Sequence, residues 1–251
     1  MFSFTVNQLL QDRSGSDEDS IRHHCRYFAP YWGEQNLVVQ FIDAIEFLPP
    51  ETIVEVSGNN GSSTIPFLEF NVDVPGSLRL EASLEGYSQQ NRPHLFIAGV
   101  KAERQAQGAM SGFMPGILNC AQKLGAEYAS LSASKIGSYA WARFGFWPTY
   151  RADRVCMQER IWQLLTEEKL CNPAEAEVVK KTAQDLPEQP KSLRNLFLIQ
   201  HLCAVTNQSF AKKLLLSEFG WSGRLNIRPG SKDLAYTLNY CRLAASRIRV
   251  A

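Results

Sequence analysis

The feature that most constrains the fold is a nearly continuous apolar run, PHLFIAGV (Pro93–Val100), followed by a polar loop that contains glycine, KAERQAQGAMSG (Lys101–Gly112). An uninterrupted apolar run of this length is typical of a central strand that is covered on both faces. Beyond the loop, apolar residues such as Phe113 and Ile117 recur at helical spacing, and Gly125 is a helix-ending glycine. The sequence therefore predicts a strand–loop–helix unit, with the regular part of the helix beginning near Pro115 or kinking there.

Before this unit the sequence predicts one helix and three strands. The spacing of apolar residues favours a helix over Leu37–Leu48, which ends at two prolines. Alternation of apolar and polar residues favours a strand over Thr52–Gly58, and Pro75-Gly76 separates two further alternating runs that read as a hairpin over Ile65–Val74 and Ser77–Glu85.

After this unit the pattern gives a strand, a short helix and another strand, and then a long helical region. The helical region, Val155–Gly220, is interrupted by prolines and is followed by a short strand within Gly223–Pro229 and a last helix over Asp233–Ile248. The elements expected before the helical region are a strand over Ala126–Ser134, a helix over Lys135–Gly145 and a strand over Phe146–Tyr150.

Composition restricts the classes of partner. The 251 residues are 45% hydrophobic and 20% charged with a net charge of +1, so charge indicates neither a nucleic-acid nor a membrane partner. No apolar run reaches the roughly 18 residues of a membrane span, and the N-terminus does not resemble a secretory signal, so we expect a cytoplasmic protein. The six cysteines form no CxxC pair and the four histidines no ligand pattern, so we expect reduced thiols and no metal.

The loop itself has two interpretations. It is either a plain strand–helix turn that bends at Gly108, or a cradle in which bare backbone N–H groups at the start of a helix bind a phosphate. Three stretches favour the second. QAQGAM (Gln105–Met110), QKLGAEYASLSAS (Gln122–Ser134) and YAWARFGFWP (Tyr139–Pro148) resemble, in order and spacing, the phosphate-binding loop, the helix–glycine–strand and the closing Gly-Phe pair of the GNAT family of coenzyme-A-dependent N-acetyltransferases.

This resemblance implies an α/β fold with a mixed, mostly antiparallel central sheet flanked by helices. It also implies a helical insert before the last strand. The corresponding domains are an acyl-CoA-binding core over residues 1–154, a helical insert or subdomain over 155–220, and a return strand and C-terminal helix over 221–251 that complete the core.

The resemblance further implies acetyl-CoA as the acyl donor. The strand end would line its pantetheine arm, backbone N–H groups of the loop would bind its pyrophosphate, and Gly108 would let the backbone come close. The residues assigned to the donor are Ala98, Gly99, Val100, Lys101, Arg104, Gln105, Gln107, Gly108, Ala109 and Met110. Met110 departs from the family, which has glycine or alanine there.

Two positions are candidates for the acid that protonates the leaving thiolate. Trp141 stands where many family members have a tyrosine, and an indole N–H is a donor but no useful acid. Tyr139 is two residues earlier, about 200° around a regular helix, so it faces away. Either Tyr139 reaches in through a distorted helix, or water or another group supplies the proton, or activity is lost.

For the base that takes a proton from the acceptor amine, the family spacing points to His94. A histidine titrates near neutral pH and suits this role. The alternative is a surface histidine at the strand start. Glu69, Asp73 and Glu81 on the hairpin are rival bases, although alternation puts Glu69 on the face opposite Leu68 and Phe70.

The sequence thus favours an acyltransferase that moves an acetyl group from acetyl-CoA directly to an amine, the acceptor being a small molecule or a protein. The alternative is a catalytically inactive binding or interaction protein on the same fold, because a fold does not fix a function. The pattern does not identify the acceptor or the oligomeric state.

Overall fold

The computed structural model describes residues 2–5, 48–58, 67–86, 93–102, 109–167, 172–199, 208–216 and 220–248. The protein is a mixed α/β protein in which the first five described strands pair in antiparallel fashion, each with the next, as do the last two. It divides into two compact units, Met1–Ser130 with Asn226–Ala251, and Leu131–Leu225. The expected helix over Leu37–Leu48 lies outside the described residues except for Leu48.

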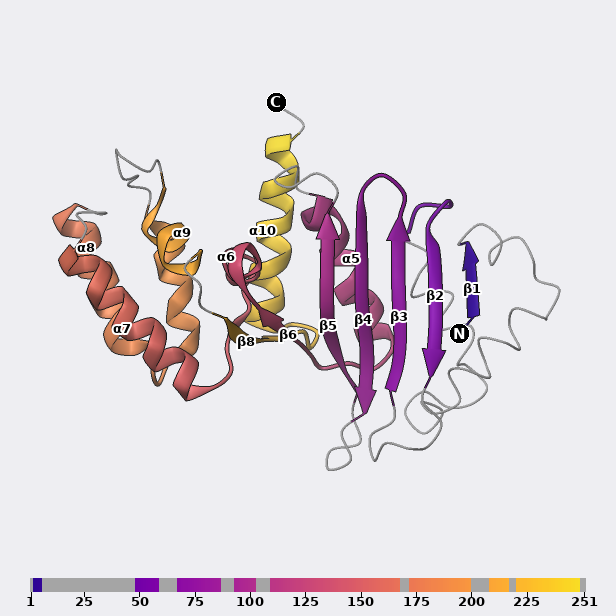
Figure 1. Cartoon of the computed structure of the whole chain (residues 1–251), viewed down its shortest axis with the longest axis horizontal. Coiled ribbons are helices and arrows are strands. Elements are labelled where there is room, and N and C mark those ends of the chain that lie inside the picture. The colour runs from indigo at the N-terminus through magenta and orange to yellow at the C-terminus, as the bar shows by residue number, and fades with distance from the viewer. Residues whose placement is uncertain are drawn as a thin grey trace. The chain divides into compact units, whose positions relative to one another are not determined.

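Five neighbouring strands form most of the sheet in the first unit, in chain order and each antiparallel to the next (Figure 1). The expected hairpin is confirmed: its turn is closed by a hydrogen bond from the Ser77 N–H to the Val74 carbonyl, with Gly76 at a φ of 68°. A positive φ suits glycine because it has no Cβ. The strands are β1 (Phe2–Thr5), β2 (Ile53–Gly58), β3 (Phe67–Val74), β4 (Leu78–Gly86) and β5 (Pro93–Ala102).

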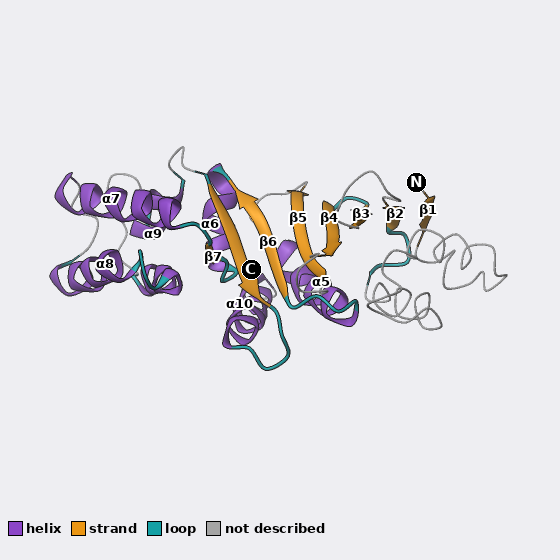
Figure 2. Cartoon of the chain, turned by 90° about the horizontal axis from the view of Figure 1, so that it is seen from below, coloured by secondary structure: helices purple, strands orange, loops and turns teal. Residues whose placement is uncertain are grey.

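The strand register gives this sheet an apolar face and a polar face. On the apolar face, Leu80 and Leu84 of β4 and Leu95 of β5 are fully buried. Two helices lie on this side, α5 (Ala109–Lys123), which contacts β4 and β5, and α10 (Lys232–Ile248), which packs on α5 (Figure 2). The other face carries the charged residues of the alternating strands, because successive side chains point to opposite sides.

The strand and the helix of the predicted unit are confirmed, with one correction; the loop between them, residues 103–108, lies outside the described residues. α5 begins at Ala109, so Pro115 lies inside the helix and does not start it. The helix ends as predicted at Gly125, which has a φ of 87°. The N–H of Ala126 donates to the Ala121 carbonyl and that of Gly125 to the Gln122 carbonyl, the paired bonds of a Schellman motif.

The chain then enters β6 (Tyr128–Ala133), the sheet neighbour of β5. The ring of Tyr128, the first residue of β6, stacks on the ring of His94, the second residue of β5, with centroids 4.9 Å apart. The two strands therefore lie side by side at their first residues. In the sequence, α5 connects the end of β5 to the start of β6.

The second unit holds the end of β6, the strands β8 and β7, and the helices between β7 and β8. The helical region expected between the last two strands is confirmed in chain order, although it begins at Arg151, and the strand expected over Phe146–Tyr150 shortens to two residues. The elements are α6 (Lys135–Arg143), β7 (Trp147–Pro148), α7 (Arg151–Glu167), α8 (Pro173–Asp185), η3 (Pro190–Leu198), α9 (Phe210–Leu215) and β8 (Trp221–Asn226).

This compact unit groups residues 131–154 with the helices, whereas the predicted acyl-CoA-binding domain extends to residue 154. Within the unit, β7 pairs with β8, Trp147 opposite Arg224. The N–H of Thr149 extends this pairing by donating to the Ser222 carbonyl at 2.8 Å.

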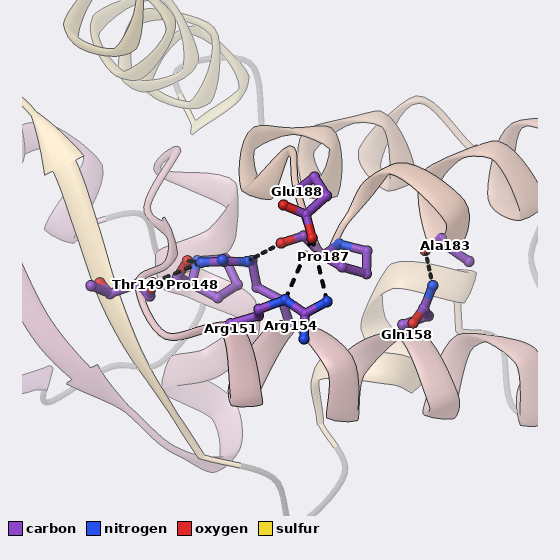
Figure 3. A network of polar contacts seen from close by, with 8 residues as sticks. All are labelled: Pro148, Thr149, Arg151, Arg154, Gln158, Ala183, Pro187 and Glu188. Atoms are coloured by element: carbon purple, nitrogen blue, oxygen red, sulfur yellow. Dashed lines mark hydrogen bonds and ion pairs between the residues drawn. The ribbon is translucent and has the colours of Figure 1, made fainter.

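Arg154 of α7 joins three segments of the second unit (Figure 3). Its Nε donates to the Pro187 carbonyl at 2.8 Å, and its Nη1 to the Thr149 carbonyl at 2.7 Å and the Pro148 carbonyl at 3.3 Å. One turn further along, Gln158 Nε2 donates to the Ala183 carbonyl at 2.8 Å. The guanidinium thus connects α7 to the end of β7 and to the turn after α8.

We expect the substitution Arg154→Ala to lower the free energy of unfolding by about 2–3 kcal/mol, because it removes hydrogen bonds from a charged donor to partly buried carbonyls. Arg154→Lys should recover only part of this loss, since an ammonium lacks the planar fork. Arg151→Ala is the control: its ion pair with Glu188 is exposed, so its loss should change stability by less than about 0.5 kcal/mol. Urea unfolding measures all three, and an equal effect of Arg151→Ala and Arg154→Ala would contradict this interpretation.

Candidate functional site

An open hollow lies on the polar face of the first unit's sheet and encloses about 510 Å³ when the solvent at its mouth is included. Its lining comes from three neighbouring strands, β3, β4 and β5, and includes three carboxylates and one aromatic ring. The lining residues are Glu69, Glu81, Ala82, Ser83, Glu85, Phe96 and Ala98.

A β-bulge shapes this hollow. Glu81 pairs with Gly99 and Ala82 with Ile97, so Ala98 is an extra residue on β5 that has no partner residue on β4. A bulge bends its strand and increases the local twist, and bulges are common beside active sites. Ala98 is exposed as a result. The residues of β5 before Ala98 and those after it pair with β4 in registers that differ by one residue.

Glu85 is held at both carboxylate oxygens. Ser83 Oγ donates to its Oε1 at 3.1 Å, and Nε2 of His94 lies 3.4 Å from its Oε2. Glu85 sits opposite His94 in the register of β4 and β5, so both side chains project from the same face. The Glu85 side chain is 34% exposed and lines the hollow, while His94 is only 4% exposed.

His94 is therefore no surface histidine, contrary to one of the two interpretations of the sequence. Its imidazole is enclosed between β4 and β6, in contact with Glu85 on one side and stacked at 12° on Tyr128 on the other. Stacking on Tyr128 and the contact with Glu85 fix the plane of the ring. His94 contacts the lining of the hollow at Glu85.

The rival carboxylates have different surroundings. Glu81 lies 3.7 Å from Arg79, and both side chains are 52% exposed. Glu69 is exposed and lines the hollow, and its neighbour Phe70 is buried, as alternation predicts. Asp73 is also exposed, but it lies opposite Arg79 and outside the lining.

The expected donor-binding residues divide into two groups. Ala98, Gly99, Val100 and Lys101 form the end of β5, where Gly99 faces the polar side and a Cβ built on it would lie 3.4 Å from Glu81 Oε2. Ala109 and Met110 are the first two residues of α5. The remaining residues, Arg104, Gln105, Gln107 and Gly108, lie outside the described residues.

Tyr139 and Trp141 belong to the other unit, on α6. Trp141 is 9% exposed and packs against Phe144 and Phe146, with ring centroids 5.9 and 5.5 Å away. Because α6 is a regular helix, Tyr139 turns elsewhere: it contacts Phe197, and its hydroxyl accepts a hydrogen bond from Arg143 Nη1 at 3.3 Å. The helix is not distorted in the way that would let Tyr139 take the place of Trp141.

Burial makes two cysteines poor nucleophiles. It raises the pKa of the Cys120 thiol to about 12, partly opposed by the Lys123 ammonium, and the pKa of the Cys241 thiol to about 11. Both thiols are therefore neutral at physiological pH, and the thiolate is the reactive form. Within the part of the chain that the structure describes, no three His, Cys, Asp or Glu side chains are grouped to hold a metal, and no helix could span a membrane.

Sequence reasoning missed Ser83 and Glu85. Alternation along β4 placed residues 81, 83 and 85 on one face, which was the available signal. Their connection to His94 depends on the pairing of β4 with β5, which the sequence pattern did not specify.

No model of a known protein family matches the chain, and no similar sequence was found among curated proteins.

Proposed function

We propose that the protein is an acyltransferase that moves an acetyl group from acetyl-CoA directly to an amine. One observation carries the proposal: the acidic hollow adjoins the bulged end of β5, the strand that leads into the glycine loop and the start of α5. A donor held by that loop and running along Ala98–Lys101 would bring its acyl end to the hollow. The resemblance to the GNAT family supports the same assignment of donor residues.

The start of α5 supplies the chemistry for an anionic donor. The first N–H groups of a helix have no partner inside the helix and carry the positive end of its dipole. In α5 these belong to Ala109, Met110 and the following residues, directly after Gly108. Such groups suit a pyrophosphate, and no acidic side chain lies in the first turn of α5 to oppose it.

The hollow supplies the chemistry for a cationic acceptor. Glu69, Glu81 and Glu85 carry carboxylates that favour an ammonium, and Phe96 offers an apolar contact for the rest of the molecule. In the reaction the amine nitrogen loses a proton and attacks the thioester carbonyl, the C–N bond forms and the C–S bond breaks. The thiolate leaves with the bonding electrons and takes up the second proton lost by nitrogen. Because the transfer is direct and has no covalent enzyme intermediate, positioning of the two substrates contributes most of the rate.

A second candidate, an inactive protein on this fold that binds ligands or partners, is favoured by the surroundings of α6. Trp141 is packed among aromatic rings and Tyr139 is engaged by Arg143, so neither is an evident acid for the thiolate. In the enzyme, water would carry the proton to the leaving thiolate. The inactive protein would bind acetyl-CoA without releasing coenzyme A, and this difference separates the two candidates.

We expect acetyl-CoA to raise the melting temperature of the full chain by several degrees, because a ligand at about 100 times its Kd adds about 2.7 kcal/mol of stability. Gly108→Val should abolish this shift, since a branched side chain keeps an anion from the backbone. Gly112→Ala is the control, because a Cβ at Gly112 meets nothing within 4 Å. Differential scanning fluorimetry measures the shift, and no shift at millimolar acetyl-CoA would reject the enzyme.

A further inference from the structure

We propose that Glu85 is the catalytic base that takes the proton from the acceptor amine, and that His94 and Ser83 position it. The proposal rests on the proposed acyl transfer and adds the residue that touches the acceptor. It assigns His94, which the sequence favoured as the base, to a supporting role.

The first argument is access. A base must come within hydrogen-bond reach of the proton that it removes. The His94 ring is enclosed by Glu85 and Tyr128 and is 4% exposed, whereas the Glu85 side chain is 34% exposed and lines the hollow. An acceptor in the hollow therefore meets the carboxylate before the imidazole.

The second argument is preorganisation. Ser83 holds Oε1 of Glu85 and His94 lies against Oε2, so the carboxylate has little freedom to turn away. The ring of His94 is itself fixed by stacking on Tyr128. By contrast, Glu81 is paired with Arg79 at a half-exposed site, where solvent weakens the interaction and a flexible pair costs side-chain entropy.

The third argument is the adjacent bulge. Ala98, the extra residue of β5, also lines the hollow, two residues beyond Phe96. The strand end assigned to the donor therefore begins at the hollow that Glu85 enters. A carboxylate on β4 and an acyl group arriving along β5 would flank one acceptor nitrogen.

The proton transfer breaks one bond and forms one bond. An N–H bond of the acceptor ammonium breaks, an O–H bond forms on Glu85, and the nitrogen keeps the electron pair with which it attacks the carbonyl carbon. Glu85 returns the proton to solvent through its exposed side after the amide has formed. His94, with its Nε2 3.4 Å from Oε2, keeps the carboxylate oriented throughout.

The test combines turnover and donor binding in the full chain. Release of coenzyme A is measured with acetyl-CoA and three probe amines: 1,4-diaminobutane, tyramine and lysine amide. We expect Glu85→Gln to lower kcat about 100-fold with less than a threefold change in KM, while the melting shift with acetyl-CoA stays as in the wild type. The matched control is Glu55→Gln, a carboxylate on the same sheet face outside the hollow, which should change kcat by less than twofold.

The role of His94 is tested with two substitutions. His94→Ala should lower kcat about tenfold, and His94→Gln should recover most of it, because glutamine keeps an N–H donor that can reach Glu85. If His94 only packed on Tyr128, glutamine would be no better than alanine. Equal loss in both variants would therefore overturn the positioning role.

The failures are distinguishable. No melting shift with acetyl-CoA in the wild type would remove the proposed function and this inference with it. A normal shift with full turnover in Glu85→Gln would overturn the inference alone. A normal shift without turnover of any of the three amines would overturn the inference together with the acyltransferase, and would favour the inactive binding protein.

Discussion

Replacing Trp141 by alanine should lower the free energy of unfolding by about 3–5 kcal/mol. The indole is nearly fully buried, between the rings of Phe144 and Phe146. Its removal would leave a cavity that a close-packed helix and two fixed rings cannot fill. Guanidinium unfolding followed by far-ultraviolet circular dichroism measures the change in midpoint at constant slope.

Trp141→Phe is the matched control for this substitution. Phenylalanine retains an aromatic contact with both neighbouring rings but lacks the N–H donor, so the expected cost is about 1–2 kcal/mol. A cost of alanine as small as that of phenylalanine would contradict the packing role. If instead Trp141→Phe kept its stability and lost turnover, the indole N–H would have a part in the reaction.

The second large effect concerns alkaline pH and Cys120. Because burial raises the pKa of its thiol from 9.0 in the unfolded chain to about 12 in the folded one, the folded state keeps a proton that the unfolded state releases. Its contribution to stability is therefore complete below about pH 9 and is lost as the pH rises toward 12. The loss approaches roughly 1.4 kcal/mol per pH unit, or about 4 kcal/mol over the whole interval.

Comparison with Cys120→Ala isolates this effect from other groups that titrate at high pH. Urea unfolding under reducing conditions at pH 7, 9 and 10 should show the wild type losing roughly 1 kcal/mol more than the variant by pH 10. The cavity left by alanine adds a constant offset that cancels in this difference. Parallel pH dependence in the two proteins would show that the Cys120 thiol has the same pKa in the folded and unfolded states, and would contradict the effect of burial.

The sequence predicted the local structure because short-range rules determine it. Gly125 ends α5 in a left-handed conformation, and Gly76 makes the turn of the hairpin. Asn172 caps α8 through a reciprocal pair of bonds with Glu175, inside the helical region that the sequence predicts to be interrupted by prolines. In each case the residues that interact are within about five positions of one another.

The candidate site needed information that is not local. Sequence reasoning placed Glu69, Glu81 and His94 near the reaction but missed Glu85, because the partner of Glu85 depends on which residue of β5 lies opposite it. The bulge at Ala98 shifts the register of β4 against β5 by one residue between Glu81 and Ala82. The alternation of residues along β5 does not indicate this shift. Regular alternation from Leu95 and Ile97 would have put Gly99 on the inner face, whereas the bulge pairs Gly99 with Glu81 of the polar face.

By itself, the sequence determined that the chain forms a hairpin, a further strand and then a helix, since hydrophobic period, glycine and proline act over a few residues. The tertiary structure alone decided that His94 is buried behind Glu85, that the hollow opens at Ala98, and that Trp141 packs while Tyr139 turns away. Those outcomes depend on strand register and on side chains from distant segments, and burial is a property of the packed fold and not of any one stretch.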